Sequence, residues 1–191
     1  MSAARSNTRE RMLASTVQSL REHGASGTSV DEVLRRSGAP RGSVYHHFPG
    51  GRAQIVEEAV ELSGAGIEAL IAGDGTADSL TTFDSFLAVW RLNLIQSGFT
   101  AGCPVLAVAI EANDDAPQLT EAAGRAFGSW QAGLRHLLRR DGVSPAHARR
   151  LATLIVASIE GAVALSRVER SIQPLDDVGR ELRGLLLEAT S

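Results

Sequence analysis

The 191-residue sequence predicts an all-α fold of nine helices. Apolar residues recur at the three- and four-residue spacing of helices along nearly the whole chain, and the alternation typical of half-buried strands is rare. Glycine- and proline-containing breaks divide this pattern into segments of helical length. Hydrophobic residues make up 43% of the chain, which is enough to form a core between such helices.

The most informative segment begins at Ser29. Ser29 and Glu32 have the spacing of a capping box, which satisfies free backbone N–H groups at a helix start. Val30, Val33 and Leu34 then form an apolar stripe at positions i, i+3 and i+4. A short helix is therefore expected here, ending at residues 37–40.

A second short helix is predicted over residues 41–48. Pro40 suits the first position of a helix, where the missing N–H costs little. Val44 and Phe48 share its inward face, and the other faces carry hydrogen-bonding side chains: Arg41, Ser43, Tyr45, His46 and His47. Two short helices joined by a glycine turn, the second rich in donors, predict a helix-turn-helix that enters a DNA major groove.

The same periodicity predicts the remaining helices, over residues 7–22, 52–71, 77–96, 104–112, 119–138, 144–170 and a last segment after Pro174. The segment from Leu151 to Leu165 is apolar almost all round, so it must be buried on more than one side. We therefore expect the last two helices to form a homodimer interface. The candidate interface residues are Leu154, Ile155, Ile159, Ala162, Leu182 and Leu186.

Charge is distributed unevenly along the chain. Residues 1–53 hold eight arginines against four acidic residues, whereas the remainder holds eleven arginines against eighteen acidic residues. A basic N-terminal part attached to an acidic body is typical of an anchored nucleic-acid-binding protein.

Composition argues against secreted and membrane proteins. The N-terminus MSAARSNTRERM lacks the apolar segment of a signal peptide. The apolar run from Leu151 to Leu165 is shorter than a bilayer span and contains Glu160. Cys103 is the single cysteine, so an internal disulfide is impossible. These features predict a cytoplasmic protein that does not insert into membranes.

The first quarter of the chain resembles the tetracycline-repressor (TetR) family of bacterial regulators. The matching residues are Arg9, Gly24, Thr28-Ser29-Val30, Val33, the run from Gly38 to Phe48, and Pro49-Gly50-Gly51-Arg52. Pro40, the Pro-Gly-Gly turn, and Gly102-Cys103-Pro104-Val105 with Glu111 are similar to the LmrA/YxaF-type subgroup.

This resemblance implies a DNA-binding domain at residues 1–51 and a ligand-binding and dimerisation domain at residues 52–191. It also implies a palindromic double-stranded DNA operator and a small-molecule effector that releases it. Thr28, Ser29 and Arg52 would contact phosphates. Arg41, Gly42 and Ser43 would face the groove, and Tyr45, His46 and His47 would complete the DNA-contacting set.

The effector pocket is expected where aromatic residues gather with a few polar groups. The candidate lining residues are Phe86, Trp90, Cys103, Ala107, Glu111, Phe127, Trp130, Gln131 and Ser158. Each of these aromatic residues could equally be ordinary core. Cys103, near a helix N-terminus, could be a redox-sensitive thiol or a small buried hydrophobe.

Other functions are less consistent with the sequence. Adjacent histidines point about 100° apart on a helix, so His46 and His47 do not make a metal site by themselves. No cofactor is expected, and an oriented nucleophile and base for an enzyme are not evident. The alternative to an effector-released repressor is a ligand-independent or partner-regulated DNA-binding protein whose body only dimerises.

Overall fold

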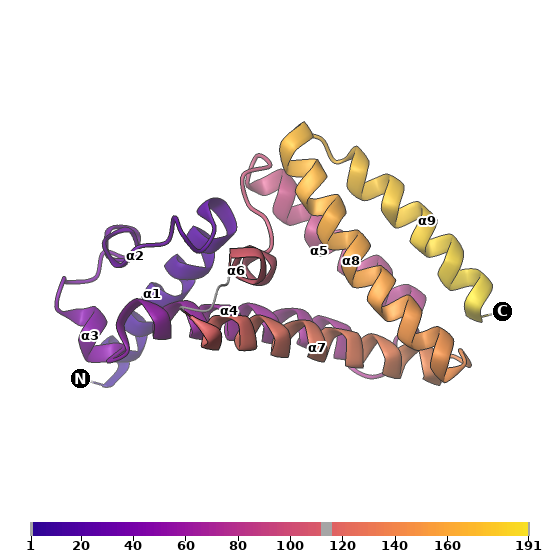
Figure 1. Cartoon of the computed structure of the whole chain (residues 1–191), viewed down its shortest axis with the longest axis horizontal. Coiled ribbons are helices and arrows are strands. Elements are labelled where there is room, and N and C mark those ends of the chain that lie inside the picture. The colour runs from indigo at the N-terminus through magenta and orange to yellow at the C-terminus, as the bar shows by residue number, and fades with distance from the viewer. Residues whose placement is uncertain (1, 112–115, 191) are drawn as a thin grey trace. The chain divides into compact units, whose positions relative to one another are not determined.

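The computed structural model describes residues 2–111 and 116–190, with side chains from residue 7 onward. These residues form nine helices and no strand, which confirms the predicted fold class (Figure 1). The helices are α1 (Ser2–His23), α2 (Val30–Ser37), α3 (Ser43–His47), α4 (Gly51–Ala72), α5 (Ser79–Gln96), α6 (Pro104–Glu111), α7 (Pro117–Arg140), α8 (Pro145–Glu169) and α9 (Gln173–Thr190).

Helix α3 begins later than the sequence predicted. The Ser43 N–H donates to the Pro40 carbonyl at 2.8 Å, which closes a turn over Arg41 and Gly42. Pro40 therefore precedes the helix instead of occupying its first position, and Gly42 is the N-cap. Val44 and Phe48 point inward as predicted and are fully buried.

The chain divides into two compact units, residues 1–63 with 103–125, and residues 64–102 with 126–191. The predicted boundary at residue 51 differs from this division. Helix α4 runs without interruption past residue 51, so its first half stays with the helix-turn-helix. Helix α6 also belongs to the first unit because it packs on α1.

The first unit is built around Phe48. Its ring is fully buried, together with Met12 and Leu20 of α1 and Val56 of α4. The Arg9 guanidinium lies 4.9 Å from the centre of the Phe48 ring, a cation–π arrangement. The Phe48 ring, which directly follows α3, is thereby tied to α1.

In the second unit, α8 packs along α9, and α5 contacts both (Figure 1). Gly179 permits the close approach of α9 to α5, since a Cβ atom there would lie 2.8 Å from Leu87 Cδ1. The Trp130 indole N–H donates to the Gly64 carbonyl at 2.9 Å, which ties α7 to α4. Gly64 also lets the Ala126 methyl group pack closely on α4.

Helix α8 is apolar on two faces, as predicted, but five of the six residues expected at the dimer interface are buried within the chain. Ile155, Ile159 and Ala162 are at most 1% exposed, and Leu182 and Leu186 of α9 are at most 3% exposed within the chain itself. Leu154 alone of the six candidate interface residues is well exposed, at 42%. The exposed apolar stripe of α8 is instead formed by Leu154, Ala157, Gly161, Ala164, Leu165 and Val168.

Helix α8 is long and apolar enough to cross a membrane, judged by length and composition alone. Half of its most apolar 18-residue stretch is buried inside the protein, and that stretch includes the buried Glu160. These are properties of a core helix.

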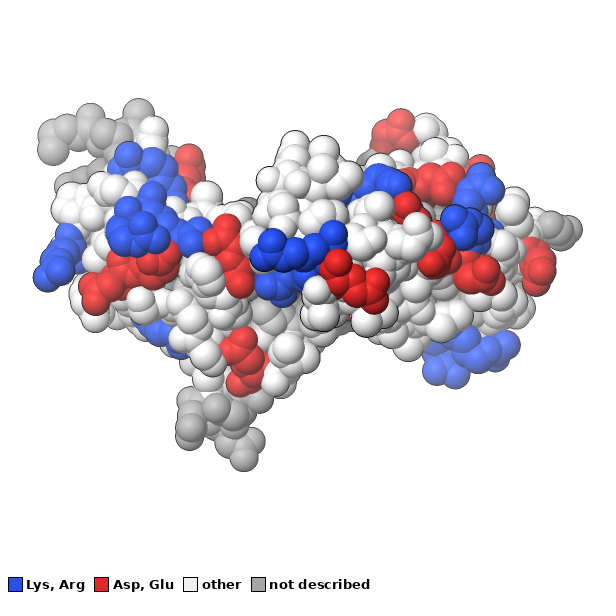
Figure 2. Space-filling model, turned by 90° about the horizontal axis from the view of Figure 1, so that it is seen from above, with Lys and Arg blue, Asp and Glu red and all other residues white. Residues whose placement is uncertain are grey.

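Basic and acidic side chains adjoin at several places on the surface in Figure 2. The described residues include ion pairs between such groups, for example Arg36 with Glu22 at 2.6 Å and Arg125 with Glu61 at 2.9 Å.

Candidate nucleic-acid interface

The cap at the start of α2 forms only in part as predicted. Ser29 has extended backbone angles, and its Oγ accepts from the Glu32 N–H at 3.2 Å. The Glu32 carboxylate does not close the capping box, because it accepts hydrogen bonds from Arg35 and Arg36 instead. These bonds lower the pKa of Glu32 to about 2, and the bond from Arg35 has the larger effect. Helix α2 ends at Gly38, which takes the left-handed conformation at φ 64°.

Arg36 joins α2 to α1, the two helices that precede α3. Its guanidinium contacts Glu32 on its own helix, and both Glu22, at 2.6 Å, and His23, at 3.0 Å, at the end of α1. The hydrogen bond from Arg36 is the main reason why the pKa of Glu22 is lowered. Helix α2 is therefore held in register with α1 by charge as well as by its buried apolar stripe.

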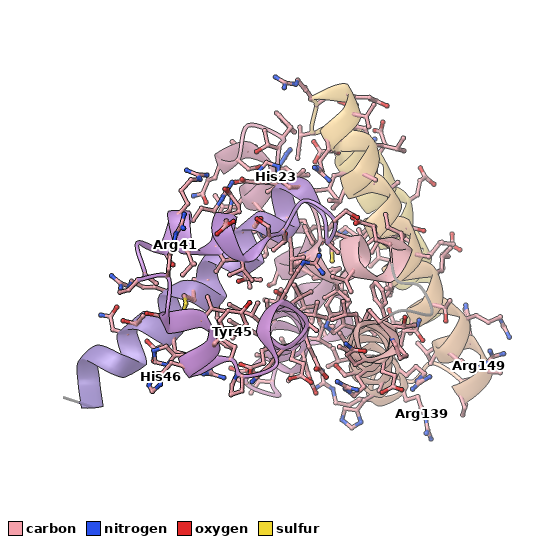
Figure 3. All side chains as sticks on the ribbon, turned by 60° about the vertical axis from the view of Figure 1, so that its left-hand side comes forward. His23, Arg41, Tyr45, His46, Arg139 and Arg149 are labelled. Atoms are coloured by element: carbon pink, nitrogen blue, oxygen red, sulfur yellow. The ribbon has the colours of Figure 1, made fainter. Side chains whose placement is uncertain are left out.

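The outward side of α3 and of the turn before it carries several of the residues that the sequence assigned to DNA. Arg41, Gly42 and His46 are exposed, and Tyr45 is 67% exposed, a high value for an aromatic side chain (Figure 3). Among the described residues, no carboxylate forms an ion pair with Arg41. An unpaired arginine beside an exposed tyrosine is suited to phosphate and base-edge contacts.

Gly42 is not required by the fold. Its φ of −73° is accessible to any residue, and a Cβ atom there would meet nothing within 4 Å. The missing side chain therefore matters only to something that approaches from outside. This observation is consistent with close backbone contact to a binding partner.

The two adjacent histidines lie in edge-to-face contact, with ring centroids 4.9 Å apart. Within the part of the chain that the structure describes, no three His, Cys, Asp or Glu side chains come together as a metal site.

Thr28 has a different task from the one predicted. Its side chain is only 1% exposed, and its hydroxyl group is placed between the Gly24 carbonyl, at 2.8 Å, and Ser19 Oγ, at 3.0 Å. Its N–H donates to the Ala25 carbonyl. Thr28 therefore stabilises the α1–α2 loop from within and does not present its hydroxyl to a phosphate, whereas Ser29 remains exposed.

Arg52 also contacts this loop. Its Nε donates to the Thr28 carbonyl at 2.8 Å, and its Nη2 donates to the Ala25 carbonyl. The residue is exposed to solvent, but two of its donor groups already hold the loop. Substitution of Arg52 would thus disturb the loop as well as any phosphate contact.

Glu111, at the end of α6, was predicted to line the effector pocket, and in the structure its carboxylate binds a loop of the first unit. Its carboxylate accepts from the Ala25 N–H at 3.0 Å, the Ser26 N–H at 2.6 Å and the Ser26 hydroxyl at 2.5 Å. Glu111 therefore binds the loop that leads into the helix-turn-helix. We call residues 25–28, held by Glu111 and Arg52, the clamped loop.

The other candidate pocket residues are divided between the two units. Cys103 and Ala107 lie with Glu111 in the first unit, where Cys103 is 5% exposed and its sulfur accepts from the Leu106 N–H at the start of α6. The remaining six lie in the second unit: Phe86, Trp90, Phe127, Trp130, Gln131 and Ser158.

Within the second unit the structure pairs Phe86 with Trp90 and Phe127 with Trp130, each edge to face along its own helix. The two indole N–H groups differ. That of Trp130 is bonded to Gly64, whereas the buried N–H of Trp90 has no acceptor among the described residues. Trp90 is thus the aromatic residue with an unused polar group.

Because the Glu111 carboxylate holds the clamped loop, we expect Glu111→Gln to destabilise the protein. A glutamine cannot accept all three hydrogen bonds, and we expect a loss of about 1–2 kcal/mol after allowing for partial exposure. Burial acts to raise the pKa of Glu111, but bonds from Ser26 and Ala25 and the nearby Arg52 charge outweigh it and lower the pKa from 4.5.

The stabilisation is therefore fully present above pH 4.5 and is lost as the pH falls through the lowered pKa. Urea unfolding of wild type and variant at several pH values measures this difference, which should shrink in acid. Glu121→Gln, at a carboxylate on α7 that is 72% exposed, is the matched control and should change stability by less than about 0.5 kcal/mol. Equal unfolding curves for the two variants would contradict the role given to Glu111.

Two family models of bacterial transcriptional regulators match this chain. Residues 12–59 match the family model described as "Bacterial regulatory proteins, tetR family". Residues 79–181 match "Transcriptional regulator LmrA/YxaF-like, C-terminal domain". The matches cover the helix-turn-helix and more than half of the chain.

Similar whole proteins point the same way. The chain is 42% identical over 185 residues to the HTH-type transcriptional regulator Rv0196 of Mycobacterium tuberculosis, covering 94% of each chain. It is 30% identical over 171 residues to the HTH-type transcriptional regulator LmrA of Bacillus subtilis, covering 88% of this chain and 91% of LmrA. A TetR transcriptional regulator from Chloroflexus aurantiacus has a similar crystal structure, with a TM-score of 0.78, 28% identity and coverage of 97% and 96%. The chain belongs to the TetR family of bacterial transcriptional regulators, with an LmrA/YxaF-like C-terminal domain.

Proposed function

We propose that this chain is a cytoplasmic repressor that binds a palindromic operator as a homodimer and releases it when a small apolar or aromatic effector binds. The observation that carries the proposal is the outward side of α3. There Arg41, Gly42, Tyr45 and His46 are exposed on an element whose inward side is fixed by Val44 and Phe48. A rigid support with unpaired donors on one face is what direct readout of bases requires.

The exposed stripe of α8 supports the homodimer. Leu165 is 53% exposed and Val168 is 84% exposed, and Gly161 lies between Leu154 and Leu165 on the same side. Small residues within an apolar stripe let two helices approach closely. Leu185 and Leu187 of α9 add exposed apolar surface. A second copy of this chain, related by a two-fold axis, would cover this surface, and its symmetry would project onto a palindromic site.

The clamped loop supports a route from effector to DNA. Helix α6 ends in the carboxylate that holds residues 25 and 26, so a displacement of α6 would pull on the loop that leads into α2. Helix α4 contributes residues to both units and begins at the end of the reading element. An effector that favours a different position of either helix would weaken operator binding, and the operator would weaken effector binding by the same factor.

The first prediction from the proposed function concerns the reading of DNA bases. Arg41→Ala should weaken binding to the preferred operator by about 1–3 kcal/mol and relax the preference at one base pair per half-site. Selection from random DNA followed by affinity measurement checks both effects. Arg125→Ala removes the same charge from α7, where Arg125 is paired with Glu57 and Glu61, and should leave the preference unchanged. Unaltered affinity and selectivity for Arg41→Ala would show that α3 does not read the bases.

The second prediction concerns the dimer. Gly161→Arg would place a charge in the proposed interface, and it should shift the protein to monomers in sedimentation, because burying an unpaired charge costs about 3–5 kcal/mol. Gly128→Arg on α7 is a matched control: both glycines are exposed in helices, and a Cβ atom at either meets nothing within 4 Å. Arginine favours helix over glycine by about 1 kcal/mol at both positions, so unfolding would not explain dissociation. A stable dimer of Gly161→Arg would place the interface elsewhere.

The third prediction concerns the effector. A ligand that accepts a hydrogen bond from the buried Trp90 N–H would give this donor a partner. A buried donor without a partner lowers the free energy of unfolding by about 1–3 kcal/mol. Among aromatic compounds found to release a labelled operator, Trp90→Phe should raise the concentration needed by about tenfold while stability is kept or increased.

Trp130→Phe is the counterpart. It breaks the bond to Gly64 and should cost about 1 kcal/mol of stability while the release concentration stays close to that of wild type. If no compound releases the operator, the body acts in dimerisation only, which is the alternative function. If Trp90→Phe responds like wild type, Trp90 is core and the effector binds elsewhere.

A further inference from the structure

A hollow of about 780 Å³ lies in the second unit, between the end of α7 and the start of α8. Five basic side chains line it: Arg135, His136, Arg139, Arg140 and Arg149. Arg139 and Arg149 come from different helices and extend outward at the same end of the unit (Figure 3). None of these residues takes part in the DNA interface or in the proposed dimer stripe.

The arginines of this hollow differ from those elsewhere on the surface in having few anionic partners. Arg140 is used within the protein, since it donates to the carbonyls of Gly75 and Ala77 and lies 3.4 Å from Asp141. For Arg135, Arg139 and Arg149, no ion pair with any described carboxylate is present. Three guanidinium groups thus face one hollow without neutralisation.

A second hollow in the same unit shows the contrast. It has a volume of about 350 Å³, and three arginines of α5 and α9 line it. Each is paired with a carboxylate: Arg91 with Asp176 at 2.7 Å, Arg180 with Asp177 at 3.0 Å and Arg183 with Asp84 at 3.3 Å. The absence of such partners around the first hollow is therefore a local feature, and not a general property of arginines in this unit.

The helix dipole explains only part of the arrangement. Arg139 and Arg140 lie in the last turn of α7, where cations are favoured. Arg135 lies one turn earlier, at the i, i+4 spacing from Arg139 that makes like charges repel. Arg149 lies near the start of α8, the end of a helix that favours anions. Their convergence costs stability unless an anion is present.

The proposed dimer does not cover these groups. At about 100° per residue, Arg149 lies roughly 140° around α8 from the middle of the stripe formed by Leu154, Gly161 and Leu165. Arg150 and not Arg149 continues that stripe toward the helix start. The hollow therefore stays open to solvent when α8 meets a second copy.

We propose that this hollow binds a small diphosphate-bearing molecule, such as a nucleoside diphosphate. Guanidinium groups match phosphate oxygens with paired, charge-assisted hydrogen bonds. Three of them are more than one phosphate needs, and a volume of about 780 Å³ is suited to a ligand of nucleotide size. Ala132 and Pro145, which complete the lining, offer apolar surface to the organic part.

Calorimetric titration of the full chain tests this proposal, with inorganic pyrophosphate and ADP as probes at about 50 mM salt, where screening is weak. We expect one site per chain, with ADP binding more tightly than pyrophosphate. The double variant Arg139→Ala/Arg149→Ala should weaken both by about a hundredfold, since each lost charge-assisted contact is worth about tenfold.

Two controls separate this site from general charge effects. Arg180→Ala/Arg183→Ala removes the same charge from α9, and Arg41→Ala removes charge from the turn before α3; both should bind the probes within twofold of wild type. Four results would each overturn the proposal. These are no saturable binding at about 10 mM probe, undiminished binding by Arg139→Ala/Arg149→Ala, an equal loss in the α9 variant, or loss of pyrophosphate binding in Arg41→Ala. The last result would assign the anion to the DNA interface.

Discussion

The peptide groups of residues 25–28 are held by opposite charges from both sides. The Glu111 carboxylate accepts hydrogen bonds from the N–H groups of Ala25 and Ser26. The Arg52 guanidinium donates to the carbonyl groups of Ala25 and Thr28. Buried or half-buried backbone groups in a loop need such partners, because no helix or sheet supplies them. The entry to α2 is fixed by this loop, and α3 follows α2 through a short turn. The entry to α2, which α3 follows, thus depends on two side chains outside the helix-turn-helix.

Local signals in the sequence were sufficient for the reading element. Ser29 caps a backbone group three residues away, Gly38 ends the same helix, and Val44 and Phe48 lie one helical turn apart. Each of these depends on neighbours within four residues, so spacing alone predicts them. There are two exceptions. Glu32 does not complete the capping box, because Arg35 and Arg36 bind its carboxylate. Pro40 is compatible with a turn as well as with the first position of a helix, and only the bond from Ser43 decides between them.

Long-range partners could not be predicted in the same way. Glu111 and Ser26 are separated by 85 residues, and nothing near Glu111 distinguishes a loop partner from a pocket lining. Helix α8 presents a related problem, because a segment that is apolar all round gives no sign of which face meets its own chain. Ile159 and Gly161 are two residues apart, yet one is fully buried and the other is exposed. Only the packing of α8 against α5 and α9 separates the two faces.

Gly24 lies where the clamped loop leaves α1, with a φ of 74°. A Cβ atom at this position would lie 2.1 Å from Glu111 Oε1, so a side chain and the clamping carboxylate cannot share the space. The two positions are therefore not free to vary independently during evolution. A relative that has lost the glycine must also have shortened, moved or replaced the acid, and its reading element must be supported by some other contact. Homologues that keep the sequence of α3 but differ at this pair would thus have inherited the helix without the same means of holding the loop before it.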